Sequence, residues 1–289
     1  MKEAMFYESE METPNPSSIC FCKLCPHFCK IPPGARGRCG VRRNARGVLE
    51  AESYGRLTSI ALDPIEKKPL YLFGRGMILS IGSYGCNFHC SFCQNHPISF
   101  GSLETVKAHE RTPEAVCARA VQLRDHGNLG VAYTYNEPFI SYEYVYDCSR
   151  LVRESGLKNV LVTNGFVTPE PLETLLPFID ALNIDLKSFD AGFYNDIGGE
   201  ISAVKKTIAL AAKYAHVEVT TLIIPQKNDS VEEMGALAAW LASVDPEIPL
   251  HITRFRPMHK LADREATTSE HISPLKIVAE KDLKYVFAH

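Results

Sequence analysis

From about residue 76 onward, short apolar runs alternate with longer amphipathic stretches. The apolar runs are typical of buried parallel strands, and the amphipathic stretches are typical of the helices that cover them. The predicted strands are 77–85, 130–136, 159–165, 181–187, 216–225 and 249–255. The predicted helices are 112–127, about 141–155, one opened by Thr168 and Pro169, about 200–214, one capped by Ser230 that ends near 243, and about 273–281. This order gives six strand–helix units, and LKYVF at 283–287 would be a seventh strand.

The repeated strand–helix order predicts an α/β fold with a parallel sheet and right-handed crossovers. We expect a partial (β/α)6 TIM-like barrel over 76–289, with a doubly wound open sheet as the alternative. A flexible N-terminus over 1–19 and a cysteine-rich N-terminal segment over 20–75 would precede it. In such a barrel the functional groups lie at the carboxyl ends of the strands.

Composition is that of an ordinary folded protein, with 45% hydrophobic and 22% charged residues in 289. The first twenty residues are acidic and carry Pro14 and Pro16, so they lack the pattern of a secretion signal. No run approaches the ~20 apolar residues that cross a bilayer. With a net charge of −3, the chain has no general attraction to nucleic acid. We therefore expect a cytoplasmic protein without a membrane partner.

One segment is strongly basic. Seven Lys or Arg residues and no acid occur between Lys23 and Arg46, interleaved with cysteines. We interpret this segment as a solvated basic loop that partly balances metal-bound thiolates, with a polyanion-binding patch as the alternative.

The ten cysteines fall mainly into two groups, and a reducing cytosol makes metal ligation a better explanation than disulfides. GCNFHCSFCQ at 85–94 contains Cys86, Cys90 and Cys93. Three thiols leave one position of a four-ligand site open. An iron–sulfur cluster could use its free iron to chelate a small molecule, whereas zinc would need His89 or His96 as its fourth ligand.

The second group comprises Cys22, Cys25, Cys29 and Cys39, with Cys20 to spare. A CxxC pair followed by two further cysteines and several glycines is typical of a metal knuckle. Zinc and an iron–sulfur cluster both remain open for this set, and an unliganded cysteine-rich tail is the alternative. Cys117 and Cys148 stand in helical segments and are interpreted as small buried apolar residues.

Polar residues gather at the carboxyl ends of the predicted strands. They are Asn136 and Glu137, Thr163 and Asn164, Asn183, Asp185 and Lys187, and His251 with Thr253. Strand alternation puts the 183, 185 and 187 side chains on one face, where they need partners or a ligand. The alternatives are a structural ion pair for Asp185 and Lys187, and a satisfied core histidine for His251.

The loop Cys86-x3-Cys90-x-Phe92-Cys93 on the first strand of a β/α barrel resembles the radical S-adenosylmethionine (SAM) enzymes. YNEP at 135–138 resembles the family's Gly-Gly-Glu-Pro stretch, with Tyr135 and Asn136 in place of the two glycines. Asp185-Leu186-Lys187, TNGF at 163–166 and His251 resemble motifs of the glycyl-radical-activating branch.

Four further stretches narrow the resemblance. CKLCPHFC at 22–29, GRCGVRRN at 37–44, DPIEKKPLY at 63–71 and GCNFHCSFCQN at 85–95 together resemble the radical SAM member of the AmmeMemoRadiSam system, a homologue of pyruvate formate-lyase activating enzyme. The chain departs from this pattern at Gln226, where glycine is usual. It also ends before the cysteine-bearing tail that relatives typically carry.

The resemblance implies a [4Fe–4S] cluster on Cys86, Cys90 and Cys93, and SAM as the second cofactor. An electron from a flavodoxin- or ferredoxin-like donor would cleave SAM to a 5′-deoxyadenosyl radical, which takes hydrogen from a partner protein. The implied SAM-binding residues are Phe92, Asn136, Glu137, Thr163, Asn164, Asp185, Lys187 and His251, with a monovalent cation near Asp185.

Two other functions remain open from the sequence. A radical SAM enzyme could act on a small metabolite instead of a protein. In a different class, a zinc-knuckle binding or adaptor protein would use both cysteine groups for zinc, and its barrel would be inert.

Overall fold

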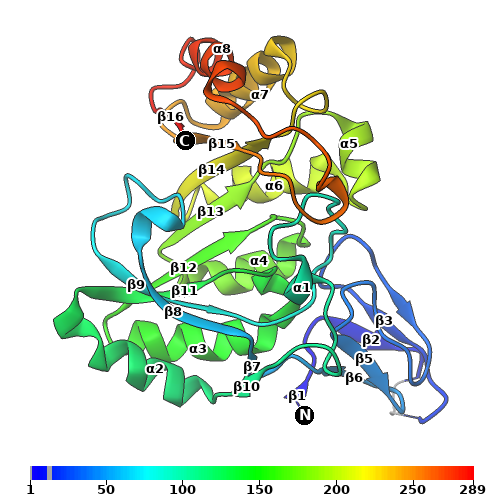
Figure 1. Ribbon diagram of the computed structural model, residues 1–289. Coiled ribbons are helices and arrows are strands. Elements are labelled where there is room, and N and C mark those ends of the chain that lie inside the picture. Colours follow the sequence, from blue (N-terminus) through cyan, green and yellow to red (C-terminus); the bar gives the residue numbers. More distant parts are fainter. Residues whose placement is uncertain (1, 12–14) are drawn as a thin grey trace.

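A large, mostly parallel sheet dominates the computed structural model, which describes residues 2–11 and 15–289 (Figure 1). Its strands are β8 (Ser59–Pro64), β9 (Met77–Gly82), β11 (Asn128–Tyr133), β12 (Lys158–Thr163), β13 (Ala181–Asp185), β14 (His216–Ile223), β15 (Leu250–Arg254) and β16 (Val286–Ala288). Their spatial order is β16-β15-β14-β13-β12-β11-β9-β8. All neighbours pair in parallel except β8, which runs antiparallel to β9.

Helices connect the parallel strands and cover the sheet. They are α1 (His96–Ser99), α2 (Pro113–Gln122), α3 (Tyr142–Glu154), α4 (Pro169–Leu175), α5 (Ala191–Asp196), α6 (Ile201–Ala211), α7 (Val231–Val244) and α8 (Ser269–Ala279), with 3₁₀ turns η1 (Ile65–Lys67), η2 (Arg124–His126), η3 (Pro138–Ser141), η4 (Leu176–Phe178) and η5 (His259–Leu261). Helix α3 contacts β11 and β12, α6 contacts β14, and α8 contacts β15. None of the helices described is long and apolar enough to cross a bilayer.

Capping explains where two of these helices begin. Thr112 Oγ1 accepts a hydrogen bond from the Ala115 N–H at 3.2 Å, and Ser230 Oγ accepts one from the Glu233 N–H at 3.1 Å. The predicted capping box at Ser230 is only half formed. The Glu233 carboxylate accepts hydrogen bonds from Ser188 and Phe189 instead, so it ties α7 to the loop after β13.

The expected partial barrel is confirmed. The outer strands β8 and β16 stand at opposite edges of the sheet and do not pair with each other, so the sheet remains open. The predicted seventh strand forms at Val286–Ala288, and the predicted last helix begins earlier, at Ser269, because Thr268 and His271 cap it. Strand β8 was not predicted and comes from the segment assigned to the cysteine-rich extension.

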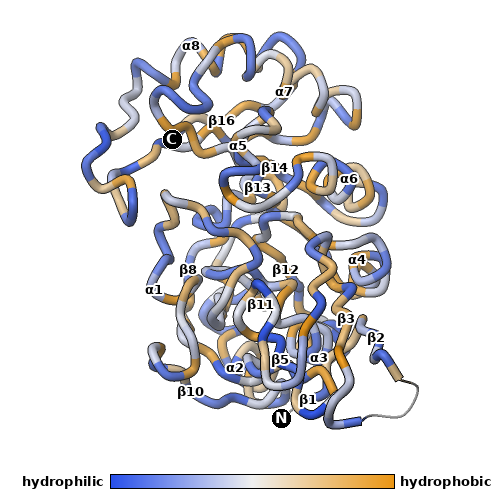
Figure 2. The backbone as a smooth tube through the Cα atoms, turned by 90° about the vertical axis from the view of Figure 1, so that its right-hand side faces the viewer, coloured by the Kyte–Doolittle hydropathy of each residue, from blue (hydrophilic) through white to orange (hydrophobic). Residues whose placement is uncertain are grey.

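The N-terminal part forms small antiparallel sheets. Strands β1 (Lys2–Glu3), β6 (Val48–Ala51) and β5 (Arg42–Ala45) form one sheet; β2 (Tyr7–Ser9), β3 (Cys20–Cys22) and β4 (Lys30–Ile31) form a second; β7 (Arg56–Leu57) pairs with β10 (His109–Glu110). Strands β1 and β2 thus lie within the segment expected to be flexible. Figures 1 and 2 show the two termini at opposite ends of the molecule.

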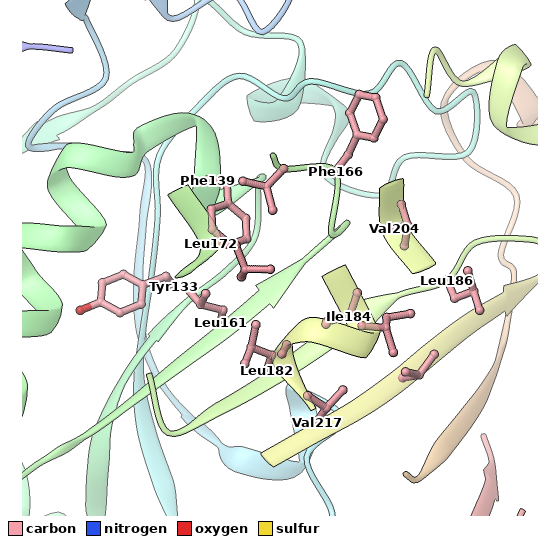
Figure 3. Close-up of a cluster of buried hydrophobic side chains, with 14 of the residues drawn as sticks. Tyr133, Phe139, Leu161, Phe166, Leu172, Leu182, Ile184, Leu186, Val204 and Val217 are labelled. Atoms are coloured by element: carbon pink, nitrogen blue, oxygen red, sulfur yellow. The ribbon is translucent and has the colours of Figure 1, made fainter. Parts of the chain in front are cut away.

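Alternation along the strands separates an apolar layer from a polar one. Figure 3 shows the apolar layer, in which side chains of β12, β13 and β14 meet α4 and α6. The labelled members are Tyr133, Phe139, Leu161, Phe166, Leu172, Leu182, Ile184, Leu186, Val204 and Val217. The intervening residues Asn183 and Glu218 are buried on the opposite, concave face. The packed layer therefore fixes the strands whose carboxyl ends carry the candidate site.

Candidate functional site

A cavity of about 360 Å³ opens at the carboxyl ends of β9, β11, β12 and β13. Most of the residues expected from the sequence line it: Cys86, Cys90, Phe92, Cys93, Asn136, Glu137, Thr163, Asn164, Asp185 and Lys187. The edge of the sheet where they meet is the one that the barrel rule predicts.

The cysteine loop that follows β9 brings three sulfur atoms to this cavity. The Phe88 N–H lies 3.4 Å from Cys86 Sγ, and the Ser99 hydroxyl lies 3.6 Å from Cys93 Sγ. Gly85, with φ of 84°, precedes the loop, and a Cβ there would lie 2.6 Å from the Cys39 carbonyl oxygen. Glycine is therefore required where the loop passes the N-terminal segment.

The donor set of this loop fits an iron–sulfur cluster. Burial raises the pKa of the Cys86 thiol well above its ordinary value and that of Cys90 to about 12, so neither ionises readily without a cation beside it. Among the described residues, no three His, Cys, Asp or Glu side chains converge as the ligands of one ion do. In a cluster each cysteine binds a different iron, so the three sulfurs need not converge on one point.

Histidines near the loop do not complete a zinc site. The His89 ring stacks on Phe100 with centroids 5.7 Å apart, and the His96 ring stacks on His259 at 4.5 Å. Neither residue lines the cavity. The geometry thus gives no support to His89 or His96 as a fourth ligand.

Glu137 places a buried carboxylate in the cavity. It accepts hydrogen bonds from Thr163 Oγ1 at 2.7 Å, the Asn164 N–H at 2.8 Å and the Phe139 N–H at 3.0 Å. Burial raises its pKa from 4.5 to about 7, although these three hydrogen bonds oppose the rise. A cationic ligand would favour the ionised carboxylate.

Two asparagines hold the cysteine loop against β11 and β12. Asn136 accepts a hydrogen bond from the Ser83 N–H at 2.8 Å and donates to the Tyr84 and Gly85 carbonyls. Asn164 donates to Asn87 Oδ1 at 2.8 Å, and its amide nitrogen lies 3.8 Å from Cys86 Sγ. Their side chains therefore position the loop as well as line the cavity.

Asp185 and Lys187 form the ion pair that strand alternation suggested. Lys187 Nζ lies 2.8 Å from Asp185 Oδ2 and 6.0 Å from the centre of the Phe92 ring. Burial opposes the lysine charge, but Asp185 and the nearby Cys90 raise the pKa of Lys187 above its ordinary value. The pair lines the cavity and offers one charge of each sign to a ligand.

His251 is the expected site residue that the structure places elsewhere. It is fully buried, with Nε2 2.6 Å from Glu218 Oε2 and Nδ1 3.3 Å from His289 Nε2. Glu218 also accepts hydrogen bonds from His216 and from the Tyr71 and Leu72 N–H groups. In the described structure His251 is therefore a satisfied core histidine, and it does not line the cavity.

Tyr135 carries a backbone conformation that usually needs glycine. Its φ is 72°, and Gln226, another position at which the family resemblance expects glycine, has φ of 61°. The Tyr135 hydroxyl donates to Asp63 Oδ2 at 2.8 Å, and Lys68 Nζ lies 3.0 Å from the same oxygen and 4.7 Å from the tyrosine ring centre. Burial opposes ionisation of Asp63, but these two donors lower its pKa to about 2.

Other lining residues were not singled out as ligand contacts. They are Pro69, Phe88, Gln94, Asn95, Ser99, Thr134, Val162, Thr220, Leu222 and Arg254. Strand alternation could have predicted Thr220 as a lining residue, because Glu218, Thr220 and Leu222 occupy every second position of β14 and share its concave face. Pro69 belongs to a loop between antiparallel strands that no periodicity revealed.

Cys22, Cys25, Cys29 and Cys39 do not line the cavity, and no three of them converge with other His, Cys, Asp or Glu side chains as the ligands of one ion among the described residues. Cys22 and Cys25 are buried, whereas Cys29 and Cys39 are partly exposed. Cys117 and Cys148 are buried in α2 and α3, next to Ser155 and Tyr144 respectively.

The motifs and the cavity agree with a match to the Radical SAM superfamily over residues 80–241. The chain therefore belongs to the radical SAM superfamily. It is a radical SAM enzyme similar to the activating enzymes, as two relatives indicate. It is 23% identical to the putative glycyl-radical enzyme activating enzyme MJ1632 of Methanocaldococcus jannaschii, covering 72% of this chain and 79% of that protein. It is 26% identical to pyruvate formate-lyase 1-activating enzyme of Escherichia coli K12, covering 56% and 68%.

A nearly full-length relative and a solved structure extend the comparison. The uncharacterized protein MJ0808 of Methanocaldococcus jannaschii is 39% identical over 99% of this chain and 84% of its own length. Streptococcus suis SuiB shares the fold with a TM-score of 0.53 at 13% identity, over 72% of this chain and 47% of SuiB.

Proposed function

We propose that this enzyme cleaves SAM reductively at a [4Fe–4S] cluster on Cys86, Cys90 and Cys93, and that the resulting 5′-deoxyadenosyl radical takes a hydrogen atom from a partner protein. The observation that carries the proposal is the meeting of the three cysteines with the buried Glu137 carboxylate in one cavity. When bound, the cluster supplies a free iron for the amino and carboxylate groups of SAM, and one electron.

The protein residues have distinct roles in this proposal. Glu137 neutralises the SAM ammonium. Hydrogen bonds from the Thr163 hydroxyl and the Asn164 N–H hold the Glu137 carboxylate in place. Lys187 and Asp185 balance the carboxylate and sulfonium charges. Phe92 covers part of the ligand, and Asn136 positions the cysteine loop. A monovalent cation near Asp185 stays a prediction, and Lys187 already occupies one oxygen of that carboxylate.

Cavity size favours a protein substrate over a small metabolite. About 360 Å³ lies at the lower end of the range for ligand pockets, roughly 300–1,000 Å³. SAM, with its adenosine and amino-acid parts, would fill most of this space. A substrate would then present its hydrogen at the mouth of the cavity, as an extended loop of another protein can. The similarity to activating enzymes supports the same choice.

The decisive experiment is anaerobic turnover of SAM. The purified protein, refilled with iron and sulfide and reduced with dithionite, should release methionine and 5′-deoxyadenosine. The triple variant Cys86→Ser, Cys90→Ser, Cys93→Ser should release none. A wild-type protein that binds zinc and neither iron nor SAM would refute the proposal and favour the adaptor function.

A second experiment separates the two substrate classes. The reaction is run with candidate proteins or metabolites in which carbon-bound hydrogen is replaced by deuterium. Deuterium in 5′-deoxyadenosine from a labelled protein supports the activating-enzyme function. Transfer only from labelled small molecules would show that the substrate is a metabolite.

A further inference from the structure

A row of aromatic rings lies on the outer side of the cysteine loop. The His89 ring stacks on Phe100, with centroids 5.7 Å apart. The His259 ring lies 5.2 Å from the Phe100 ring and stacks on His96 at 4.5 Å. His89 is exposed and Phe100 is 39% exposed, and none of the four residues lines the cavity. The four rings therefore form one continuous strip outside the site described above.

Two exposed cations border this strip. A Cβ added at Gly198 would lie 3.6 Å from Arg38 Nη2 and 3.9 Å from His89 Nδ1, so the guanidinium and the ring approach the same backbone position. On another side of the strip, the Lys260 N–H donates to the Ser91 carbonyl at 3.0 Å. Partial burial lowers the pKa of His89, and the Arg38 and Lys260 charges lower it further. Positive charge therefore surrounds the exposed rings.

The rings and the two cations together form a surface that we call the outer patch. Its members are Arg38, His89, His96, Phe100, His259 and Lys260. In the basic N-terminal segment, Arg36 and Arg43 both pair with Glu52. Arg38 and Lys260, in contrast, form no ion pair with an acid in the part of the chain that the structure describes. The outer patch thus presents positive charge that the protein itself does not neutralise.

The outer patch lies on the back of the loop that carries the three cysteines. Cys90 and Phe92 are buried and line the cavity, whereas the alternating residues His89 and Ser91 do not line it. The His89 N–H donates to the Ile197 carbonyl at 2.9 Å, which fixes the loop on this side. One thickness of the loop therefore separates the outer patch from the Cys90 thiol.

The loop after β15 supplies part of the outer patch. Its base is closed by Thr267, whose N–H donates to the Phe255 carbonyl at 3.0 Å and whose hydroxyl donates to the Ile223 carbonyl at 2.5 Å. Its tip carries His259 with φ of 54°, a conformation that is strained for a residue other than glycine. Figure 1 shows η5 reaching the loop between β9 and α1. The fold thus holds a strained histidine against the cysteine loop.

We propose that the outer patch is the docking surface for the electron donor of this enzyme, a small acidic protein that carries single electrons. The proposal rests on the proposed function, because reductive cleavage of SAM needs such a donor. In the step itself one electron leaves the reduced carrier, which is oxidised, and enters the enzyme, which is reduced. No covalent bond forms or breaks between the two proteins.

The location of the outer patch favours the electron donor over the substrate. A substrate has to reach the mouth of the cavity, where its hydrogen is taken, and no residue of the outer patch lines that cavity. Electron transfer slows steeply with distance, so a donor has to dock beside the cysteine loop. Because SAM fills the cavity under the proposed function, the outer side of the loop is the approach that remains open to the donor.

The chemistry of the outer patch fits an acidic protein. Unpaired Arg38 and Lys260 around the partly exposed Phe100 offer charge complementarity together with an apolar contact. Encounters between redox proteins bury less than about 1,200 Å², so a surface of a few residues can serve. Nucleic acid, the other common polyanion, binds such surfaces by stacking bases on free ring faces. Here the two stacked pairs of rings already cover one another.

Binding of oxidised flavodoxin to the refilled, oxidised enzyme tests the docking surface without turnover. At low ionic strength Arg38→Glu/Lys260→Glu should weaken binding at least tenfold in isothermal titration calorimetry. The difference should shrink in about 0.5 M NaCl, because salt screens exposed charges. The matched control Lys213→Glu/Lys281→Glu makes the same change of charge at exposed positions in the turns that lead into β14 and β16, at the opposite end of the sheet. It should bind flavodoxin as wild type does.

Three binding results would overturn the proposal. The first is equal affinity of wild type and Arg38→Glu/Lys260→Glu for flavodoxin. The second is a wild type that binds neither flavodoxin nor an acidic ferredoxin. The third is a wild type that binds a single-stranded oligonucleotide more tightly than either carrier, with that binding lost in the variant, which would make the outer patch a nucleic-acid surface. Near-ultraviolet circular dichroism and iron content check that each variant is folded and filled.

Reductant dependence separates docking from a structural role. In Arg38→Glu/Lys260→Glu, SAM cleavage driven by dithionite, a small reductant that needs no docking surface, should stay within about twofold of wild type. Cleavage at limiting reduced flavodoxin should fall at least tenfold. Equal losses with both reductants would show that the outer patch only supports the loop, and no loss with either would show that the donor docks elsewhere; both results overturn the proposal. If wild type cleaves no SAM with either reductant, the proposed function fails, while flavodoxin binding still decides whether the outer patch docks a carrier.

Discussion

Replacing Glu137 with glutamine tests how the enzyme recognises SAM. The carboxylate is 4% exposed, and burial raises its pKa from 4.5 to about 7. That rise corresponds to about 3 kcal/mol of unfavourable charge burial when the group is ionised. The SAM ammonium would offset this cost. Because a hydrogen bond between charged groups contributes about 1.5–3 kcal/mol, Glu137→Gln should weaken SAM binding about 10- to 100-fold at pH 8.

The pH dependence carries the sharper test. With a pKa of about 7, the wild-type carboxylate is about nine-tenths protonated at pH 6, so SAM should bind about tenfold more weakly there than at pH 8. Glu137→Gln has no carboxyl to titrate, and its remaining pH dependence reports the titration of SAM itself. Equilibrium binding to the refilled, oxidised protein avoids turnover during the measurement.

Unfolding of the ligand-free protein gives an independent measure of the same pKa. Between about pH 4.5 and pH 7 the folded protein holds the Glu137 proton and the unfolded chain does not. The raised pKa therefore favours folding at low pH, and this contribution is lost as the pH rises to about 7. Urea unfolding at pH 5 and pH 8 should show a larger loss in wild type than in Glu137→Gln. If wild type and Glu137→Gln show the same pH dependence in SAM binding and in unfolding, the assignment is refuted.

Three further substitutions probe the surroundings of the cavity. Lys187→Met should reduce the rate of SAM cleavage, measured by 5′-deoxyadenosine release, at least tenfold, which corresponds to about 1.4 kcal/mol. Lys187→Arg, which keeps the charge, should retain more activity. His251→Leu should lower the free energy of unfolding by about 1–3 kcal/mol in urea and leave SAM affinity unchanged; a loss of affinity would place it at the site. In Gly199→Ala the new Cβ would lie 2.3 Å from the Phe88 ring, so the free energy of unfolding should fall by about 1–3 kcal/mol and the iron content should drop. Gly235→Ala is the control, because its Cβ would make an ordinary contact at 3.4 Å.

The sequence predicted the barrel well because its parallel strands are apolar and its helices are amphipathic. Strand β8 escaped because it carries Asp63 and Pro64 and lies at a sheet edge, where apolar periodicity is weak. The short N-terminal strands escaped because two or three residues cannot show a period.

At the site, the sequence predicts which residue types gather at the strand ends. It does not predict how deep in the barrel each side chain lies. Asp185 and Lys187 lie on one face, as alternation required. His251 shares the concave side of the sheet, but its ring pairs with the Glu218 carboxylate. Glu218 also pairs with His216. Depth within a barrel depends on strand stagger, which one sequence does not encode in its periodicity. The bond between Tyr135 and Asp63 was likewise invisible, since 72 positions separate them.

The left-handed backbone conformation at Tyr135 should make the residue types at positions 63 and 68 depend on the residue at position 135 during evolution. A glycine there would need no help, whereas a tyrosine holds that conformation with its hydroxyl on Asp63 and its ring against Lys68. Chains of this superfamily with a large residue at the corresponding point should then also keep an acid and a base at the other two, and chains with glycine should be free to vary them. Covariation among these three alignment columns would thus record, across lineages, the strain of one backbone dihedral and the two side chains that offset it.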